Sequence, residues 1–520
     1  MKKTLLSLAL ALLSSLSMSA KDYTDALVVT VNGTATRQTA TICVDENNDG
    51  TYNFNLKNFM LKMGKESMGI GNITLNNLKA AKSDKGDVVS THQNITITAG
   101  DDPNVSNWMG PMLDTIPLDL KLLVNDKKLY TLIDIDMQKK LGQTIHVTFG
   151  DNYQLPNSGF EDFHTATLVS PEDSNTTCSG DEPNAWHSFQ SATGTQPWVW
   201  LAGGSSSYLY KSTEVRPGST GKQSALLTSH NMIFVIANGT MTTGRLSAGS
   251  MTATDPSNHS QLDMSSTDKD GNGDPFYTIM DGTPDSIAVW VKFKQETPVA
   301  DHPYASISAA ITDGTYYQDP QEEGKTYNNV VATAKNAKIE SKGFVWQRIT
   351  APFVYTDNNV NGKAILITIS TNADPGQGST DSLYVDDISL IYNIEKPALS
   401  VDGKAVELSS SNLTVKTADP ANATITPTTG NRGSFAAMNT ISSNDNQKIV
   451  RILYCADDLN TVKAYTLTLV KDNATGINAI AADSNAAPEL YNLAGQRISN
   501  AQPGQIVIVK KGDKAVKVLK

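Results

Sequence analysis

The stretch DGTYNFNLKNF, residues 49–59, decides the fold of the first part of the chain. Asp49 and Gly50 form a two-residue turn signal, and the side chains of Tyr52, Phe54 and Leu56 then alternate with polar ones. A period of two places every second side chain on one face of a strand, and an Asp-Gly pair beside such a run indicates a hairpin. The stretch therefore predicts half-buried antiparallel strands.

The same pattern extends from residue 21 to residue 150, where alternating runs separated by turn residues predict eight strands. Eight strands in a meander can remove their edges by closing into a barrel. Residues 21–150 resemble the calycin-like (lipocalin-like) domain found in exported proteins of Gram-negative gut bacteria, and residues 49–59 carry most of that resemblance. The resemblance implies an eight-stranded β-barrel.

Residues 151–394 are framed by two motifs, NSGFEDF at 157–163 and SLYVDDISL at 382–390. With segments at 242–246, 282–287 and 346–349, these motifs resemble the "putative carbohydrate metabolism domain" family and jelly-roll β-sandwiches of the carbohydrate-binding type. The resemblance implies a carbohydrate ligand class and no mechanism.

The rest of the chain also predicts strands. Alternating runs between residues 395 and 473 indicate a small immunoglobulin-like (Ig-like) β-sandwich, and residues 474–488 read as a linker. Residues 489–520 resemble the β-rich C-terminal tails of secreted proteins from the same bacteria, which in some relatives act as sorting motifs for outer-membrane export. The predicted fold class is therefore all-β throughout.

The first 20 residues predict a secretory signal peptide, because Lys2 and Lys3 precede an apolar run over residues 5–16 and small residues lead up to Ala20. No cysteine lies in or just after this segment, so a lipoprotein anchor is not expected. No later stretch reaches the ~20 apolar residues of a transmembrane helix. We expect export to the periplasm, the outer-membrane surface or the medium, without membrane insertion.

Charge and metal-ligand spacing exclude several classes of function. Lys and Arg number 42 and Asp and Glu 53, a net charge of −11, or −13 without Lys2 and Lys3. This balance argues against nucleic-acid binding through bulk charge. The three cysteines, Cys43, Cys178 and Cys455, are scattered and predict free thiols, and the seven histidines form no HExxH or i, i+4 pair, so the spacing gives no support for zinc catalysis.

A glycan or oligosaccharide is the expected partner, because flat aromatic faces pack against the C–H side of a pyranose ring. Trp198 and Trp200 share one face of a predicted strand, and Tyr208 and Tyr210 share one face of the next. These four residues form the predicted carbohydrate platform, with burial in the core as the alternative for each. Three other tryptophans lie in family-like or apolar segments and are assigned to the core: Trp186, Trp290 and Trp346.

Structural Ca²⁺ is the one expected cofactor, since closely spaced oxygen ligands around a glycine turn suit this ion. In the loop at 268–274, alternate side chains could converge: Asp268, Asp270, Asn272 and Asp274. An ordinary hairpin turn is the alternative there, and it is favoured for the acidic loop at 45–50.

A second Ca²⁺ prediction comes from the jelly-roll resemblance, which implies that Glu161 and Asp387 hold a structural ion. The alternative is that Glu161 caps a turn and Asp387 faces water.

Three functions remain open from the sequence, and it assigns no catalytic residue and no protein partner. The first is a non-catalytic, exported accessory protein that binds carbohydrate through residues 151–394. The second is a glycan hydrolase, which needs two facing carboxylates. The third is an apolar-ligand carrier, which requires an open barrel; an interior filled by Phe54, Leu56, Ile133 and Phe149 would make the barrel structural.

Overall fold

The computed structural model describes residues 20–63, 66–138, 142–150, 152–204, 206–232, 235–356, 361–430, 432–472, 487–511 and 514–519. Nearly all of the regular structure in these ranges is strand, so the predicted all-β class is confirmed. Residues 1–19 of the predicted signal peptide and residues 474–486 of the predicted linker lie outside the described ranges. Among the described residues, no helix has the length and apolar character needed to cross a membrane.

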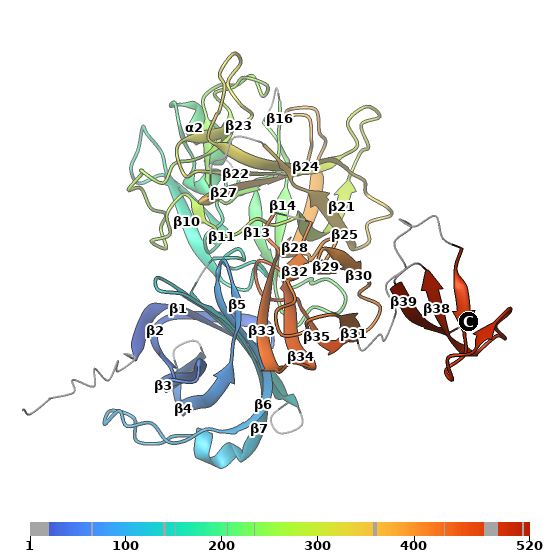
Figure 1. The fold of residues 1–520 in the computed structure, drawn as a ribbon. Helices are drawn as coiled ribbons and strands as arrows, with labels where there is room; N and C mark the ends of the chain where they lie inside the picture. Colours follow the sequence, from blue (N-terminus) through green and yellow to red (C-terminus); the bar gives the residue numbers. More distant parts are fainter. Residues whose placement is uncertain are drawn as a thin grey trace, which may run out of the picture.

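The N-terminal strands curl into a ring, seen at the lower left of Figure 1. Every neighbouring pair is antiparallel, and the last strand pairs back onto the first through Leu27↔Phe149. The ring consists of β1 (Lys21–Val31), β2 (Thr34–Glu46), β3 (Thr51–Met63), β4 (Glu66–Lys79), β5 (Ala81–Ser83), β6 (Gly86–Thr96), β7 (Thr115–Val124), β8 (Leu129–Met137) and β9 (Gln143–Phe149).

One bent strand closes this ring. Only Ala80 separates β4 from β5; β4 pairs with β3, and β5 pairs with β6. The segment thus passes from one neighbour to the other and joins the two ends of an eight-stranded, calycin-like barrel. A short 3-10 helix, η1 (Gly110–Leu113), lies between β6 and β7.

Bulky side chains fill the barrel. Phe54, Leu56, Ile133 and Phe149 are each at most 2% exposed and belong to one apolar cluster with residues from all around the ring. Since the alternation that begins at Asp49-Gly50 directs these side chains inward, the interior is packed as a core. This observation favours a structural barrel over a carrier.

The central domain is a sandwich of two main sheets, above the barrel in Figure 1. The first contains β17 (Thr240–Thr242), β20 (Thr278–Ile279), β22 (Ala305–Thr312), β24 (Val330–Ile339), β26 (Val354–Tyr355) and β27 (Ala364–Ser370). The second contains β13 (Leu209–Ser212), β14 (Ser224–Thr228), β21 (Ser286–Gln295), β25 (Gln347–Pro352) and β28 (Asp381–Ile391).

Smaller elements flank this sandwich. They are the hairpin of β10 (Phe163–Val169) and β11 (Thr177–Pro183), the hairpin of β15 (His230–Asn231) and β16 (Ile236–Ala237), a four-stranded sheet of β12 (Thr193–Gly194), β18 (Arg245–Ala248), β19 (His259–Leu262) and β23 (Tyr317–Asp319), a 3-10 helix η2 (Phe189–Ser191) and a short helix α2 (Trp198–Gly203).

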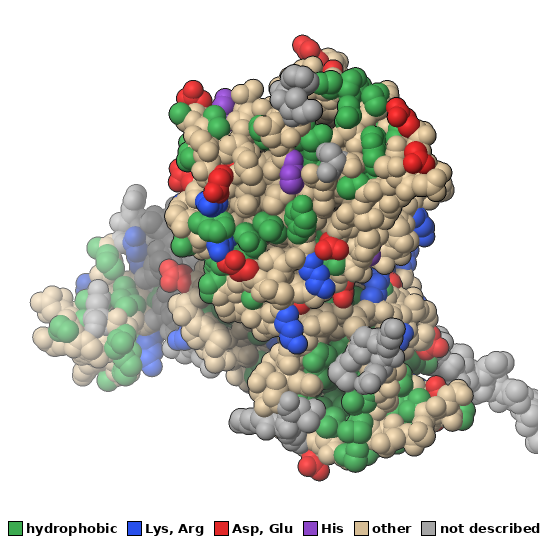
Figure 2. Space-filling view, turned by 180° about the vertical axis from the view of Figure 1, so that it is seen from behind, with side chains coloured by type: hydrophobic (Ala, Val, Ile, Leu, Met, Phe, Trp, Pro, Cys, Tyr) green, Lys and Arg blue, Asp and Glu red, His purple; other side chains and the backbone are tan. Residues whose placement is uncertain are grey.

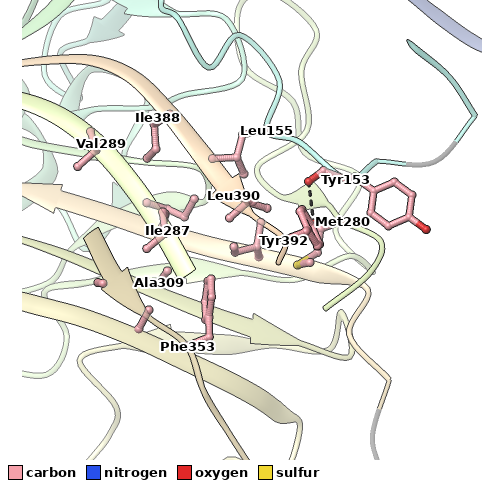
Figure 3. Close-up of a cluster of buried hydrophobic side chains, with 14 of the residues drawn as sticks. Tyr153, Leu155, Met280, Ile287, Val289, Ala309, Phe353, Ile388, Leu390 and Tyr392 are labelled. Carbon is pink, nitrogen blue, oxygen red and sulfur yellow. Dashed lines mark hydrogen bonds between the residues drawn. The ribbon is translucent and has the colours of Figure 1, made fainter. Parts of the chain in front are cut away.

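The sandwich core lies between the two main sheets. Val289 and Val291 on β21 and Ile367 on β27 are at most 1% exposed and belong to one apolar cluster. At the end of the sandwich nearest the barrel, Tyr392 lies beside Tyr153 and Met280, and its hydroxyl donates a 2.8 Å hydrogen bond to the Tyr153 carbonyl (Figure 3).

The Ig-like unit lies against both the barrel and the central domain. Its sheets are β30-β29-β32 and β31-β35-β34-β33, and the second joins the barrel sheet because Met438 on β33 pairs with Lys82 on β5. The strands are β29 (Ala398–Val401), β30 (Lys404–Val406), β31 (Asn412–Thr417), β32 (Ile425–Thr428), β33 (Phe435–Ser443), β34 (Gln447–Cys455) and β35 (Val462–Lys471).

Polar contacts fix this junction. Lys85 donates to the Asp457 carboxylate and to the Gly433 carbonyl, and the Tyr130 hydroxyl donates to the Asp458 carbonyl. The other oxygen of Asp457 accepts the backbone N–H of Thr283 at 2.8 Å. Asp457 therefore joins the barrel, the central domain and the Ig-like unit.

The C-terminal sheet pairs with no other described strand. It has the order β37-β36-β38-β39, with β36 (Glu489–Tyr491), β37 (Arg497–Ile498), β38 (Ile506–Lys511) and β39 (Lys514–Leu519).

Candidate functional site

The tryptophans of the predicted platform do not lie on a strand. Residues 198–203 form helix α2, which follows Pro197, so the predicted strand at Trp198 and Trp200 is wrong. Side chains two residues apart on a helix point in different directions, whereas on a strand they share a face. Both indoles are half-buried, and Val199 between them is buried.

The two tyrosines of the platform also separate. Tyr208 is 0% exposed and packs against Phe189 and His230, whereas Tyr210 is 37% exposed. The hydroxyl of Tyr210 donates to the Ser207 carbonyl at 2.8 Å. The structure therefore does not assemble the four predicted residues into one flat surface.

An aromatic group that the sequence did not predict lies on the outer side of the five-stranded sheet. Trp186 is buried as predicted, but Trp290 and Trp346 are half-buried, so their assignment to the core is wrong. On β21 and β28, Val289, Val291 and Val385 point into the sandwich, and the residues that alternate with them point outward. Trp290 and Tyr384 are two of these outward residues, and the rings of Phe344 and Trp346, from the segment before β25, pack against Tyr384. We call Trp290, Phe344, Trp346 and Tyr384 the outer aromatic face.

The rings of Phe344, Trp346 and Tyr384 are close to one another, and cations lie over Phe344 and Trp290. The Tyr384 ring centroid lies 6.0 Å from that of Phe344 and 6.3 Å from that of Trp346. The ammonium of Lys292 lies 4.2 Å from the Phe344 centroid, and the guanidinium of Arg216 lies 5.3 Å from the Trp290 centroid. Phe344 has φ of 60°, a strained value for an aromatic residue.

The acidic loop at 268–274 does not direct its side chains to one point. Asp268 forms an ion pair with Arg245 at 2.9 Å, and Asn272 donates to Asp274 at 2.9 Å. One oxygen of Asp270 accepts the backbone N–H groups of Asn272 and Asp274, as in an ordinary turn. The four side chains therefore do not converge as the sequence suggested. Ca²⁺ binding by this loop stays a prediction.

Glu161 and Asp387 do come together, on either side of Gly159. Glu161 accepts the backbone N–H groups of Lys222 and Gln223, and Asp387 forms an ion pair with Arg216. Glu161 therefore caps a turn, while Asp387 has a cation beside it. The Ca²⁺ site implied by the jelly-roll resemblance stays a prediction.

A buried group of two histidines and two carboxylates lies beside the β10–β11 hairpin. We call His164, Glu182, His187 and Asp270 the histidine–carboxylate cluster. His164 and Glu182 are direct cross-strand partners, and their side chains are 10% and 0% exposed. The side chains of His187 and Asp270 are 0% exposed.

The distances within this cluster are short. Oδ2 of Asp270 lies 3.3 Å from Nε2 of His164 and 3.3 Å from Nε2 of His187, and Oε2 of Glu182 lies 3.9 Å from Nε2 of His164. Sequence reasoning singled out only Asp270, because the other three residues stand far from it in the chain and follow no ligand motif. Pairing of β10 with β11 and packing of the loop bring them together.

Two buried carboxylates on β28 are expected to make the stability of the central domain depend on pH. Burial raises the pKa of Asp381 and of Asp386 to about 6, above the ~3.9 of a free Asp. Because the folded pKa is the higher one, the stabilisation is fully present below about pH 4 and is lost as the pH rises through about 6.

We therefore expect the urea concentration at the unfolding midpoint to decrease as the pH is raised from 5 to 8. Asp386→Asn is expected to reduce this decrease. Oδ1 of Asp386 has no hydrogen-bond partner and could be replaced by the amide group. The exposed Asp301→Asn serves as a control that keeps the original profile. A midpoint that rises with pH would contradict the prediction.

Comparison with known proteins matches the N-terminal barrel to a family model. No curated protein matches the chain. A crystal structure from Bacteroides fragilis, described as "a putative outer membrane protein", is 10% identical over 68% of this chain and 96% of its own, with a TM-score of 0.19. Residues 20–152 match the family model described as the calycin-like beta-barrel domain, to which the ring of β1 to β9 is therefore similar.

Proposed function

We propose that this chain is an exported, non-catalytic accessory protein of carbohydrate use in Gram-negative gut bacteria, and that it binds glycan on the outer aromatic face. The observation that carries the proposal is the grouping of the half-buried rings of Phe344, Trp346 and Tyr384 beside β28, with the half-buried Trp290 outward on the neighbouring strand β21. Apolar ring faces held against a sheet suit the C–H side of pyranose rings.

Polar groups at the edges of this face suit sugar hydroxyls. Lys292 pairs with Glu214, and Arg216 pairs with Asp387, so donors and acceptors flank the rings. These pairs also hold the side chains in place, which reduces the entropy lost on binding. Ring faces on the outer side of a sheet suit an extended oligosaccharide better than an enclosed monosaccharide.

The proposal of export rests on the N-terminal 20 residues, with their two lysines, apolar run and small residues. Acidic and basic side chains are scattered over the face shown in Figure 2, and the described residues there form no broad patch of one sign. That distribution agrees with a neutral partner such as a glycan better than with a polyanion.

A glycan-array screen of the full chain tests the proposal, with binding followed by titration of the best ligand. Trp346→Ala and Tyr384→Ala are expected to raise Kd at least about tenfold, or about 1.4 kcal/mol, because each removes a stacking face. Trp198→Ala and Trp200→Ala are the matched controls, since they remove indoles from helix α2 and are expected to leave Kd unchanged.

Other outcomes would contradict the proposal in distinct ways. Weaker binding in the Trp198 and Trp200 variants alone would place the glycan site at the residues predicted from the sequence. Accumulation of reducing ends during incubation would show hydrolysis. Absence of binding to every glycan on the array would contradict the proposed function.

A further inference from the structure

The outer aromatic face is continuous with a row of side chains that crosses four strands of the five-stranded sheet. These strands lie in the order β13-β14-β28-β21-β25 (Figure 1). Tyr210 on β13 pairs with Leu226 on β14, which pairs with Tyr384 on β28. Tyr384 in turn pairs with Lys292 on β21. Directly paired residues of antiparallel strands lie on the same face of a sheet, so the four side chains form one row.

Burial places this row on the outer side of the sheet. Each member of the row has a sequence neighbour that is 0% exposed and belongs to the sandwich core: Leu209, Ala225, Val291 and Val385. The row itself is half-buried except for Tyr210 at its end, which is 37% exposed. Because side chains alternate along a strand, the row points away from the core.

A second row, of polar side chains, runs beside the first. Thr228, Ser382 and Lys294 each lie two residues from the first row, on β14, β28 and β21, and Ser382 pairs with both of the others. All three are half-buried. A pyranose ring likewise has an apolar C–H side and polar hydroxyls around its edge, so the two rows match its two kinds of surface. We call the two rows together the outer strip.

Aromatic rings lie at both ends of the outer strip. Tyr210 and Tyr384 stand on strands two positions apart, which separates their backbones by roughly 9–10 Å. On the other side of Tyr384, toward β25, the ring centroid of Trp346 lies 6.3 Å away. A single pyranose ring covers one aromatic ring, so rings spread over this distance suit a ligand of several linked sugars.

The segment that follows β13 borders the first row on the side away from the polar row. Glu214 pairs with Lys292, and the guanidinium of Arg216 lies over the ring of Trp290. The backbone N–H of Arg216 donates to Oδ2 of Asp386 at 2.9 Å. These contacts hold the segment across the outer side of the sheet, so it follows the same direction as the row.

We propose that the glycan site extends from Trp346 and Tyr384 across β14 to Tyr210, and that it binds a linear oligosaccharide that runs across the strands. The inference rests on the proposed glycan binding and adds to it the length and direction of the ligand. Tyr210 stacks on a sugar at one end of the oligosaccharide, Leu226 contacts the middle, and the polar row binds hydroxyls along one edge.

Titration calorimetry of the full chain with cello-, xylo- and manno-oligosaccharides of two to six sugars tests the inference. Affinity in the best of the three series is expected to rise with chain length, because each added sugar covers more of the outer strip. Tyr210→Ala is expected to raise Kd for the hexasaccharide about three- to tenfold, the effect of one stacking contact, and Kd for the disaccharide less than about twofold. Tyr384→Ala is expected to raise both.

Two further variants make the comparison specific. Tyr210→Phe keeps the ring and loses only the hydroxyl that donates to the Ser207 carbonyl, so it is expected to recover the hexasaccharide affinity that Tyr210→Ala loses. Val354→Ala changes a 68% exposed side chain on β26 of the other main sheet and is expected to leave Kd unchanged for every length. Equal effects of Tyr210→Phe and Tyr210→Ala would overturn the inference, because the hydroxyl and not the ring would then be required.

The remaining outcomes separate this inference from the proposed function. A hexasaccharide Kd that depends on Tyr384 but not on Tyr210 would overturn the inference and leave glycan binding on the outer aromatic face in place. If Tyr210→Ala does not fold, the unchanged chain decides, since equal affinity for two and six sugars would overturn the inference. Binding of no member of the three series would also overturn it, whereas the glycan array decides the proposed function by itself.

Discussion

Replacing Trp186 with alanine is expected to destabilise the central domain by about 3–5 kcal/mol. The indole is 0% exposed, packs edge-on against Phe160 at 5.3 Å and donates from Nε1 to the Pro156 carbonyl. Alanine would leave a large cavity and an unsatisfied carbonyl. Urea unfolding followed by tryptophan fluorescence measures this loss, because four other tryptophans remain in residues 151–394.

Trp186→Phe is the matched variant. It keeps a ring against Phe160 and loses the Nε1–H donor, so we expect a loss of only about 1–3 kcal/mol. Equal losses for the two variants would mean that the hydrogen bond, and not the packing, is what the site requires. A loss below about 0.5 kcal/mol for Trp186→Ala would contradict the assignment of Trp186 to the core.

Replacing Lys85 with methionine is expected to destabilise the junction of the three domains by about 2–4 kcal/mol. The Asp457 side chain is 6% exposed, and Lys85 is its cation. Removal of one partner leaves a buried charge uncompensated, which costs more than the pair contributes. The Thr283 contacts to the other oxygen of Asp457 remain, so the loss is smaller than for a fully isolated charge.

Lys82→Met is the control, since Lys82 lies on the same hairpin and is 64% exposed, while its partner Asp87, 13% exposed, still accepts the Tyr52 hydroxyl when Lys82 is removed. Exposed pairs contribute about 0–1 kcal/mol. Limited proteolysis provides a second measurement. Lys85→Met should accelerate cleavage of the segments at the junction of the barrel and the Ig-like unit, and Lys82→Met should not. Similar cleavage rates in both variants would show that the buried pair does not hold the junction.

Local patterns predicted the strands well because alternation is a local signal. The run after Asp49-Gly50 became β3, with Phe54 and Leu56 inside the barrel as the period of two requires. Alternation alone could not place Trp198, because Pro-Trp-Val-Trp fits a strand and a short helix equally well. Nor could it assign Trp290, since a strand in a sandwich has an outer face as well as an inner one.

The sites were less predictable because they depend on contacts between distant segments. Alternate acidic residues at 268–274 suggested one shared ion, yet Asp268 pairs with Arg245 while Asp270 turns toward His164 and His187. The register of β10 with β11, which sets His164 opposite Glu182, has no signature in either strand alone. Such clusters arise from tertiary structure and are visible only once the chain is folded.

The contact between Lys85 and Asp457 also affects biogenesis. The two residues are 372 positions apart, so at about 5–20 residues per second a ribosome needs about 20–70 s to make the second after the first. During that interval the newly made barrel displays Ala81, Val88 and Tyr130, apolar side chains that the later domains cover. A nascent chain of this design therefore leaves these apolar side chains exposed until its last third has emerged.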